Sequence, residues 1–223
     1  MVEPRTDERR WAYRGLMTAS QRERAALVET LRAANPDAPT LCTGWTVRDL
    51  AAHLVLREYR PDATPGIAVA PLAGYTARVQ RHIAESTSYE QMVDQIASGP
   101  PLYSPFKLLD PLVNATEMFV HHEDVRRAEP GWQPRSLDDE TTTALRRGIP
   151  MLSRVALAKV PARLTLRTPQ GQTLATVGSG PEVTVTAEPG ELLMFEFGRD
   201  ELRAEFSGTD DAVAGVRSSK RGL

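Results

Sequence analysis

The chain has 223 residues, a size at which one large domain or two small ones can bury a core without disulfides. Its 41% hydrophobic and 25% charged residues exclude a disordered, collagen-like or membrane-spanning composition. A net charge of −2 argues against a protein that mainly neutralises nucleic-acid phosphates or anionic lipid. The single cysteine, Cys42, excludes a disulfide framework and an all-thiolate metal cage within one chain.

The N-terminal segment and the hydropathy pattern indicate where the protein works. Residues 1–10 are charged and lack the apolar core and cleavage site of a signal peptide. No stretch approaches the roughly 18 consecutive apolar residues of a spanning helix. We therefore expect a cytoplasmic protein with no membrane partner. No basic stripe with interleaved aromatics is present, so we expect no nucleic-acid partner either, and both a monomer and a homodimer remain open.

The first two thirds of the chain have helical periodicity. A first helix is predicted from Pro4 to about Ala34. A second helix begins after Thr46, which forms a capping box with Asp49, and ends at Arg60 because a residue before proline avoids the helical conformation. Further helices are predicted at about 72–85, from Ser88 to Gly99, at about 108–128, and at about 137–159 with a bend near Pro150.

After Pro161 the hydrophobic period changes from 3.6 to 2, which indicates strands. Strands are predicted at 163–167, 173–177 and 182–186, followed by a short helix from Pro189, a strand at 202–206 and a terminal helix from Asp210. The predicted fold class is therefore α+β. We expect a helical bundle over residues 1–160 and a small α+β domain over residues 161–223.

Two predicted helices carry side chains that are typical of metal sites. Glu117 and His121 are four residues apart and therefore project from the same helix face. His53 lies on the apolar face of the second helix, where the polar ring of a histidine needs either a hydrogen-bond partner or a bound ligand. A His2Glu set with an open fourth position is typical of catalytic zinc. Asp124, one turn beyond His121, can accept the other ring N–H of that histidine.

Each of these features also has a purely structural interpretation. His53 alone is more often a hydrogen-bonded core histidine than a ligand, and a Glu–His pair at this spacing is common on helix surfaces. We expect His122 at the surface or beside the ligands, His82 in solvent, and Cys42 as a small packing residue rather than a fourth ligand. Composition and spacing alone therefore indicate a metal site and leave it open.

Several segments of the chain resemble a known family. Residues 41–54 (LCTGWTVRDLAAHL) resemble the signature of the maleylpyruvate isomerase N-terminal domain, a member of the DinB-like metal-binding bundles, and residues 117–125 (EMFVHHEDV) resemble its E-x-x-x-H-x-x-D segment. Residues 57–62 and 121–128 are most similar to an actinobacterial subfamily described only as metal-binding. Residues 192–199 (LLMFEFGR) more weakly resemble the family's ending, in which the arginine reaches toward the active site.

The resemblance implies a DinB-like four-helix bundle in which His53, Glu117 and His121 bind a divalent metal. Zn2+ is the usual metal, although this donor set also accepts Ni2+ or Fe2+. The resemblance further implies mycothiol, a low-molecular-weight thiol, as the usual partner. The doubled histidine at His122 and the Arg-Pro-Asp stretch depart from the isomerase branch, so the isomerase substrate is not implied.

The leading functional hypothesis is a metal-dependent thiol transferase or isomerase that acts on a small electrophilic molecule. A bound cation deprotonates a coordinated thiol, and the thiolate is the nucleophile. Arg57 and Arg199 are candidates for holding anionic groups of the thiol cofactor or the substrate, and with Asp124 they form the predicted catalytic set. Their alternative interpretation is as surface arginines.

Two other hypotheses remain open at this stage. One is a metal-dependent hydrolase of a small amide or ester, in which Glu58 or Asp124 serves as the base. The other is a non-catalytic protein that binds a metal or another ligand. Arg126 and Arg127 are expected to complement the dipole at the end of their helix.

Overall fold

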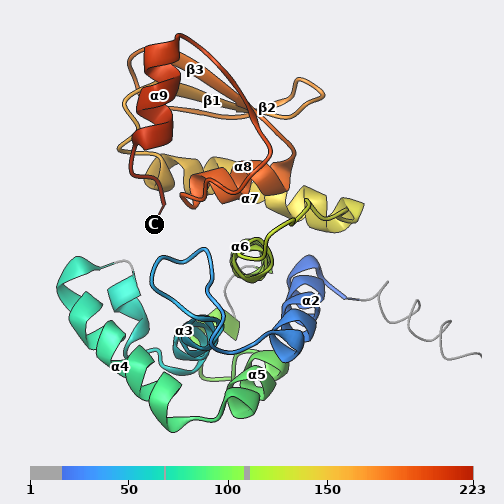
Figure 1. The fold of residues 1–223 in the computed structure, drawn as a ribbon, viewed down its shortest axis with the longest axis vertical. Coiled ribbons are helices and arrows are strands. Elements are labelled where there is room, and N and C mark those ends of the chain that lie inside the picture. The colour runs from blue at the N-terminus through green and yellow to red at the C-terminus, as the bar shows by residue number, and fades with distance from the viewer. Residues whose placement is uncertain (1–16, 68, 108–110, 223) are drawn as a thin grey trace, which may run out of the picture.

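The computed structural model describes residues 17–67, 69–107 and 111–222 (Figure 1). The predicted first helix is described from Ala19, and the predicted part from Pro4 to residue 16 lies outside the described residues. The α-helices of the bundle half are α2 (Ala19–Ala33), α3 (Val47–Tyr59), α4 (Ala73–Ser86), α5 (Tyr89–Ser98), α6 (Pro111–Arg126) and α7 (Asp139–Ala156). Short 3-10 turns lie at Thr64–Ile67, Ala70–Leu72 and Pro105–Lys107.

The helix starts follow the local capping chemistry. At α3 the Thr46 hydroxyl accepts a hydrogen bond from the backbone N–H of Asp49 at 3.2 Å, while the Asp49 carboxylate accepts one from the N–H of Thr46 at 2.9 Å. Ser88 and Gln91 form the same reciprocal box at α5. Both predicted starts are therefore confirmed, because each box satisfies two donors that the first turn leaves without a partner.

The C-terminal part is a four-stranded sheet with two helices. Its elements are β1 (Arg163–Arg167), β2 (Thr173–Val177), β3 (Glu182–Thr186), α8 (Pro189–Glu196), β4 (Glu205–Ser207) and α9 (Asp210–Ser218). The strand order is β2-β1-β3-β4, with β1 and β3 parallel and the two outer pairs antiparallel. The first three strands are confirmed with their predicted bounds. β4 begins three residues later than predicted and extends to Ser207.

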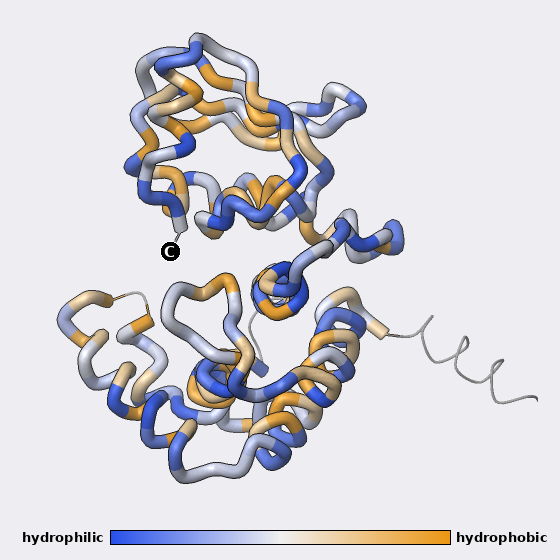
Figure 2. Tube along the Cα trace, viewed as in Figure 1, coloured by the Kyte–Doolittle hydropathy of each residue, from blue (hydrophilic) through white to orange (hydrophobic). Residues whose placement is uncertain are grey.

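Two hydrophobic clusters form the core, and α6 contributes to both. One α6 face, with Met118 and Val125, packs among α2 to α5, whereas Phe119 and Val120 pack against α7, α8 and the sheet. Figure 2 shows apolar segments on α8 and on the strands above it. This arrangement confirms the α+β fold class and places α6 at the centre of the molecule (Figure 1).

The boundary predicted at residue 160 remains a prediction. Helix α7 lies on the bundle side of that boundary, yet its Leu145 and Ile149 are fully buried in the cluster that contains the sheet. Among the described residues, no helix combines the length and apolar character needed to cross a membrane.

Candidate metal centre

The three predicted ligands come together between α3 and α6. The Nε2 atom of His53 on α3 lies 3.7 Å from Glu117 Oε1, and the Nε2 atom of His121 lies 3.2 Å from the same oxygen. Both histidines are 6% exposed, and the Glu117 side chain is 17% exposed. One donor atom from each of the three residues lies within 4.8 Å of the others. Glu117 and His121 are four residues apart on α6, and His53 on α3 lies beside them. Together the three residues form one His2Glu donor set.

The donor spacing fits a divalent cation. Zn2+ bonds to imidazole nitrogen and carboxylate oxygen are about 2.1 Å long, so tetrahedral geometry places neighbouring donor atoms about 3.4 Å apart. The observed 3.2 and 3.7 Å lie on either side of that value. Two neutral imidazoles and one carboxylate are also donor types that zinc prefers, and a three-residue set leaves a coordination position for another molecule.

Asp124 contacts the other side of the His121 ring. Its Oδ2 atom lies 3.0 Å from His121 Nδ1, the contact that the sequence predicted. When Nδ1–H donates to this carboxylate, the lone pair of Nε2 points toward the donor set, as a metal ligand requires. Burial lowers the pKa of His121, but hydrogen bonds with Asp124, Cys42 and Glu117 outweigh it and raise that pKa well above its usual value. A metal ion must therefore displace a proton from this ring.

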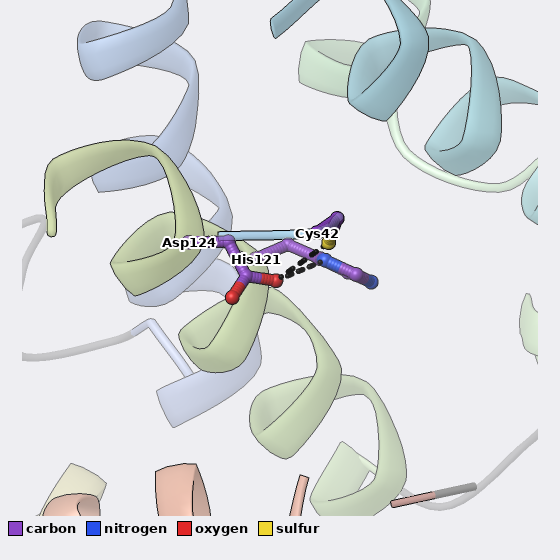
Figure 3. A group of neighbouring side chains, drawn as sticks. All are labelled: Cys42, His121 and Asp124. Atoms are coloured by element: carbon purple, nitrogen blue, oxygen red, sulfur yellow. Dashed lines mark hydrogen bonds and ion pairs between the residues drawn. The ribbon is translucent and has the colours of Figure 1, made fainter. Parts of the chain in front are cut away.

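Arg199 and Cys42 hold Asp124 from the C-terminal part and from the loop before α3. The Arg199 guanidinium donates from Nε to Asp124 Oδ1 at 2.7 Å and from Nη2 to Oδ2 at 2.6 Å. The thiol of Cys42 donates to Oδ2 at 3.2 Å, and Figure 3 shows it beside His121 and Asp124. Burial raises the pKa of Asp124, but its bonds to His121 and Arg199 outweigh burial and lower it to about 2.

A buried cation lies next to Glu117. Arg57 is 4% exposed, and its Nε lies 3.6 Å from Glu117 Oε1. Its Nη1 donates to Asn114 Oδ1 at 3.2 Å, and the guanidinium stacks 4.0 Å from the centre of the Phe106 ring. Burial raises the pKa of Glu117, but Arg57 and the two histidines outweigh it and keep that pKa well below its usual value. The carboxylate is therefore charged and ready to act as a ligand.

A second group of donors shares His121 but is a poorer metal site. Cys42, His121 and Asp124 also lie close enough to surround an ion. However, Arg199 contacts both oxygens of Asp124 and lies 3.2 Å from Cys42 Sγ. A metal ion there would have to displace a cation that bonds to both oxygens of its carboxylate ligand, whereas the cation beside the His53, Glu117 and His121 set, Arg57, makes a single, longer contact of 3.6 Å with Glu117.

Sequence reasoning missed three neighbours of the donor set. Cys42 was expected only to pack, yet its thiol bonds to Asp124. Trp45 lies with its ring centre 5.0 Å from that of His53, and Asn114 fixes Arg57. A signal existed for Asn114, because it precedes Glu117 by three residues and so shares its helix face. No comparable spacing connects Cys42 with Asp124.

Two other expectations are corrected and a third is confirmed. His122 is not at the surface: it is 3% exposed, and its Nε2 lies 2.8 Å from Thr30 Oγ1 on α2, because α6 is covered on opposite sides. Glu58 pairs with Arg24 and not with the donor set. His82 is exposed, as expected.

The two arginines near the end of α6 do more than complement a helix dipole. Arg126 bonds to Glu123 at 2.9 Å. Arg127 is buried, and it bonds to Glu123 and to Glu191 of α8, each at 2.6 Å. Arg127 therefore also has a role that the expectation did not include, because a buried guanidinium has to be matched by carboxylates.

Comparison with known proteins identifies the family to which the chain belongs. The model of the mycothiol maleylpyruvate isomerase N-terminal domain matches residues 17–194. The crystal structure of the mycothiol-dependent maleylpyruvate isomerase aligns with a TM-score of 0.55 and 14% identity, covering 85% of this chain and 90% of that chain. A mutant of that enzyme with a histidine replaced by alanine aligns over the same shares, also at 14% identity, with a TM-score of 0.50.

This degree of structural likeness shows a common fold. A search of curated proteins gives no match to the sequence. The family match, in contrast, spans well over half of the chain and includes α3 and α6, which carry the donor set. The protein therefore belongs to the mycothiol maleylpyruvate isomerase N-terminal domain family.

Proposed function

We propose that the protein is a metal-dependent transferase or isomerase that uses a mycothiol-type thiol on a small electrophilic molecule. The observation that carries the proposal is the convergence of His53, Glu117 and His121 at the separation of zinc ligands. Membership of a family named for a mycothiol maleylpyruvate isomerase supports mycothiol as the thiol co-substrate. Zn2+ is the proposed metal, with Ni2+ or Fe2+ as alternatives for the same donors.

The proposed roles follow from the charges around the donor set. A divalent cation held by His53, Glu117 and His121 would supply a Lewis acid that keeps a bound thiol deprotonated for attack on an electrophilic carbon. Asp124 would fix the tautomer and orientation of His121. Arg57, beside Glu117, and Arg199, beside Asp124, would add positive charge that holds anionic groups of the thiol or substrate.

The contacts favour thiol chemistry over hydrolysis by a metal-activated water. Such a hydrolase needs a carboxylate or histidine positioned to act as a base. Of the two carboxylates considered, Glu58 forms an ion pair with Arg24, and Asp124 bonds to His121, Cys42 and Arg199. Both carboxylates are therefore already bonded to other side chains of the protein.

The metal part is tested by elemental analysis of the full-length protein. We expect close to one divalent metal per chain in the wild type, and a large loss in His53→Ala and in His121→Ala because each removes one of three ligands. His82→Ala is the matched control, since His82 is exposed on α4. Unchanged metal content in the two ligand variants would overturn the proposal.

The thiol part is tested by thermal unfolding of the zinc-loaded protein with mycothiol. Because a ligand that binds only the folded state stabilises it, mycothiol at 100 times its Kd should add about 2.7 kcal/mol. For a chain of this size, this corresponds to a rise in Tm of roughly 5–10 °C. Turnover of amides or esters without thiol would instead support the hydrolase, and saturable binding with no product from any electrophile would support a binding protein.

A further inference from the structure

A buried chain of charges connects the bundle to the C-terminal part. It starts at Glu23 on α2, which accepts a bond from Arg135 at 2.7 Å, and continues to Glu123 on α6. Glu123 is 1% exposed, and it also accepts a bond from Arg127 at 2.6 Å. Arg127 in turn donates to Glu191 on α8. The alternation of carboxylate and guanidinium matches each buried charge with an opposite one.

Arg127 is the member of this network that reaches the segment carrying Arg199. Its Nη1 donates to the backbone carbonyl of Glu201 at 2.7 Å and to the Glu191 carboxylate at 2.9 Å. Glu191 in turn accepts a bond from the backbone N–H of Arg203 at 2.7 Å. The segment from residue 199 to residue 203 is thus held at two backbone positions by one buried ion pair.

The C-terminal end of α6 contacts the 199–203 segment at a second point. Asp124 and Arg127 are three residues apart near the end of α6, and Asp124 binds the Arg199 guanidinium while Arg127 binds the backbone at Glu201. Arg221 also pairs with Asp200; the Arg221 side chain is 3% exposed and that of Asp200 is 74% exposed. The backbone N–H of Arg199 donates to the Met194 carbonyl at 3.0 Å. Arg127 differs from these contacts because it is buried and holds the segment at two backbone positions, Glu201 directly and Arg203 through Glu191.

We propose that Arg127 is a positioning residue: through Glu191 and the Glu201 carbonyl, it fixes the segment that presents Arg199 to Asp124 and Cys42. Arg127 touches none of the candidate metal ligands, and its effect on the centre passes through Arg199, Asp124 and then His121. A lysine cannot replace it, because one ammonium cannot reproduce the bidentate contact with Glu191 while also reaching Glu201 and Glu123. The inference rests on the proposed function only for the importance of Arg199.

Cys42 provides a direct reporter of the Arg199 position. It is the single cysteine of the chain, it is only half-buried, and its Sγ lies 3.2 Å from Arg199 Nη2. The alkylation rate of a thiol depends on its electrostatic surroundings and its accessibility. The rate with iodoacetamide, measured at one pH on the metal-free full-length chain, therefore changes when the guanidinium leaves, whether or not the protein is an active enzyme.

The experiment compares three substitutions with the wild type. Arg199→Gln defines the alkylation rate without the guanidinium, and we expect it to differ from the wild-type rate by about threefold or more. Arg127→Met should move the rate in the same direction and most of the way to that value. Arg135→Met is the matched control: it removes another guanidinium bound to Glu123, but within the described part of the chain Arg135 bonds to Glu23 and Glu123 and not to the 199–203 segment, so the rate should stay near that of the wild type.

Thermal unfolding separates positioning from general destabilisation. Both methionine variants should lower Tm, because each leaves buried carboxylates with fewer partners, yet only Arg127→Met should move the alkylation rate. If Arg127→Met does not fold, Arg127→Lys and Glu191→Gln replace it with the same expected direction. The proposal is overturned if the rate in Arg127 variants stays at the wild-type value, if Arg135→Met moves it equally, or if Arg199→Gln has no effect. Failure of the metal or thiol tests would leave these outcomes unchanged.

Discussion

At the scale of single residues, Asp124 connects the candidate metal centre to the rest of the molecule. Its two oxygens accept bonds from His121, Arg199 and Cys42, and it is fully buried. With a pKa of about 2 it carries a negative charge at neutral pH. Removing that charge while preserving the shape would therefore weaken both the orientation of His121 and the attachment of Arg199.

We predict that Asp124→Asn lowers the affinity for zinc about 10- to 100-fold, because the ligand histidine loses its carboxylate partner. The affinity is measured by competition with a chromogenic chelator. Asp94→Asn is the control, since the side chain of Asp94 is 71% exposed and pairs only with Arg32 among the described residues. An affinity in Asp124→Asn equal to that of the control would contradict this role for Asp124.

At the scale of elements, the contact between α6 and α7 depends on a glycine. A Cβ atom at Gly148 of α7 would lie 2.6 Å from Thr116 Cγ2, and Thr116 directly precedes Glu117 on α6. Thr116 is 2% exposed, so its methyl group has little space to retreat. The absence of a side chain at residue 148 therefore lets α7 approach the helix that carries two of the three candidate ligands.

We predict that Gly148→Ala lowers the free energy of unfolding by about 1–3 kcal/mol, because overpacking outweighs the better helix propensity of alanine. Gly74→Ala provides the matched test on α4, where no atom lies within 4 Å of the added Cβ and the residue is exposed. That substitution should raise the free energy of unfolding by about 0.4–1 kcal/mol. Urea unfolding of both variants measures the difference, and stabilisation by both would refute the close contact.

At the scale of the whole molecule, stability depends on a carboxyl group buried in the C-terminal core. Glu196 at the end of α8 is fully buried, and Ser153 of α7 donates a hydrogen bond to its Oε1 atom. Its Oε2 atom has no hydrogen-bond partner among the described residues. Burial raises the pKa of Glu196 to about 8, despite the opposing effect of Ser153. The folded protein therefore keeps this group neutral at pH 7.

This protonation makes folding pH-dependent. Between the ordinary pKa of 4.5 and about 8, the folded state binds a proton that the unfolded state has lost. The contribution of Glu196 to the free energy of unfolding thus falls by about 1.4 kcal/mol per pH unit as the pH rises, and it levels off above the folded pKa. In Glu196→Gln this dependence disappears, so the variant should gain stability relative to the wild type from pH 5 to pH 8.

The measurement is urea unfolding of the wild type and Glu196→Gln at pH 5, 6.5 and 8, because the difference between the two proteins cancels all other titrating groups. Glu205→Gln, at an exposed position on β4, should show a constant difference from the wild type. A constant difference for Glu196→Gln as well would show that this carboxyl is not buried in solution.

The sequence by itself determined the elements and their class. Hydrophobic period, capping pairs such as Thr46 with Asp49, and proline positions act over a few residues, so helices, strands and their order were predictable. Spacing also placed Glu117 and His121 on one face of α6, whereas joining them with His53 required the resemblance to a family.

Only the tertiary structure decided which residues each helix face contacts. Asp124 lies 82 residues from Cys42 and 75 from Arg199 along the chain, so no local pattern could pair them. The burial of His122 and the role of Arg127 follow from a helix that is covered on opposite sides, which periodicity does not reveal. Local sequence fixes the direction of a side chain relative to its own helix, while its partners depend on how the helices pack.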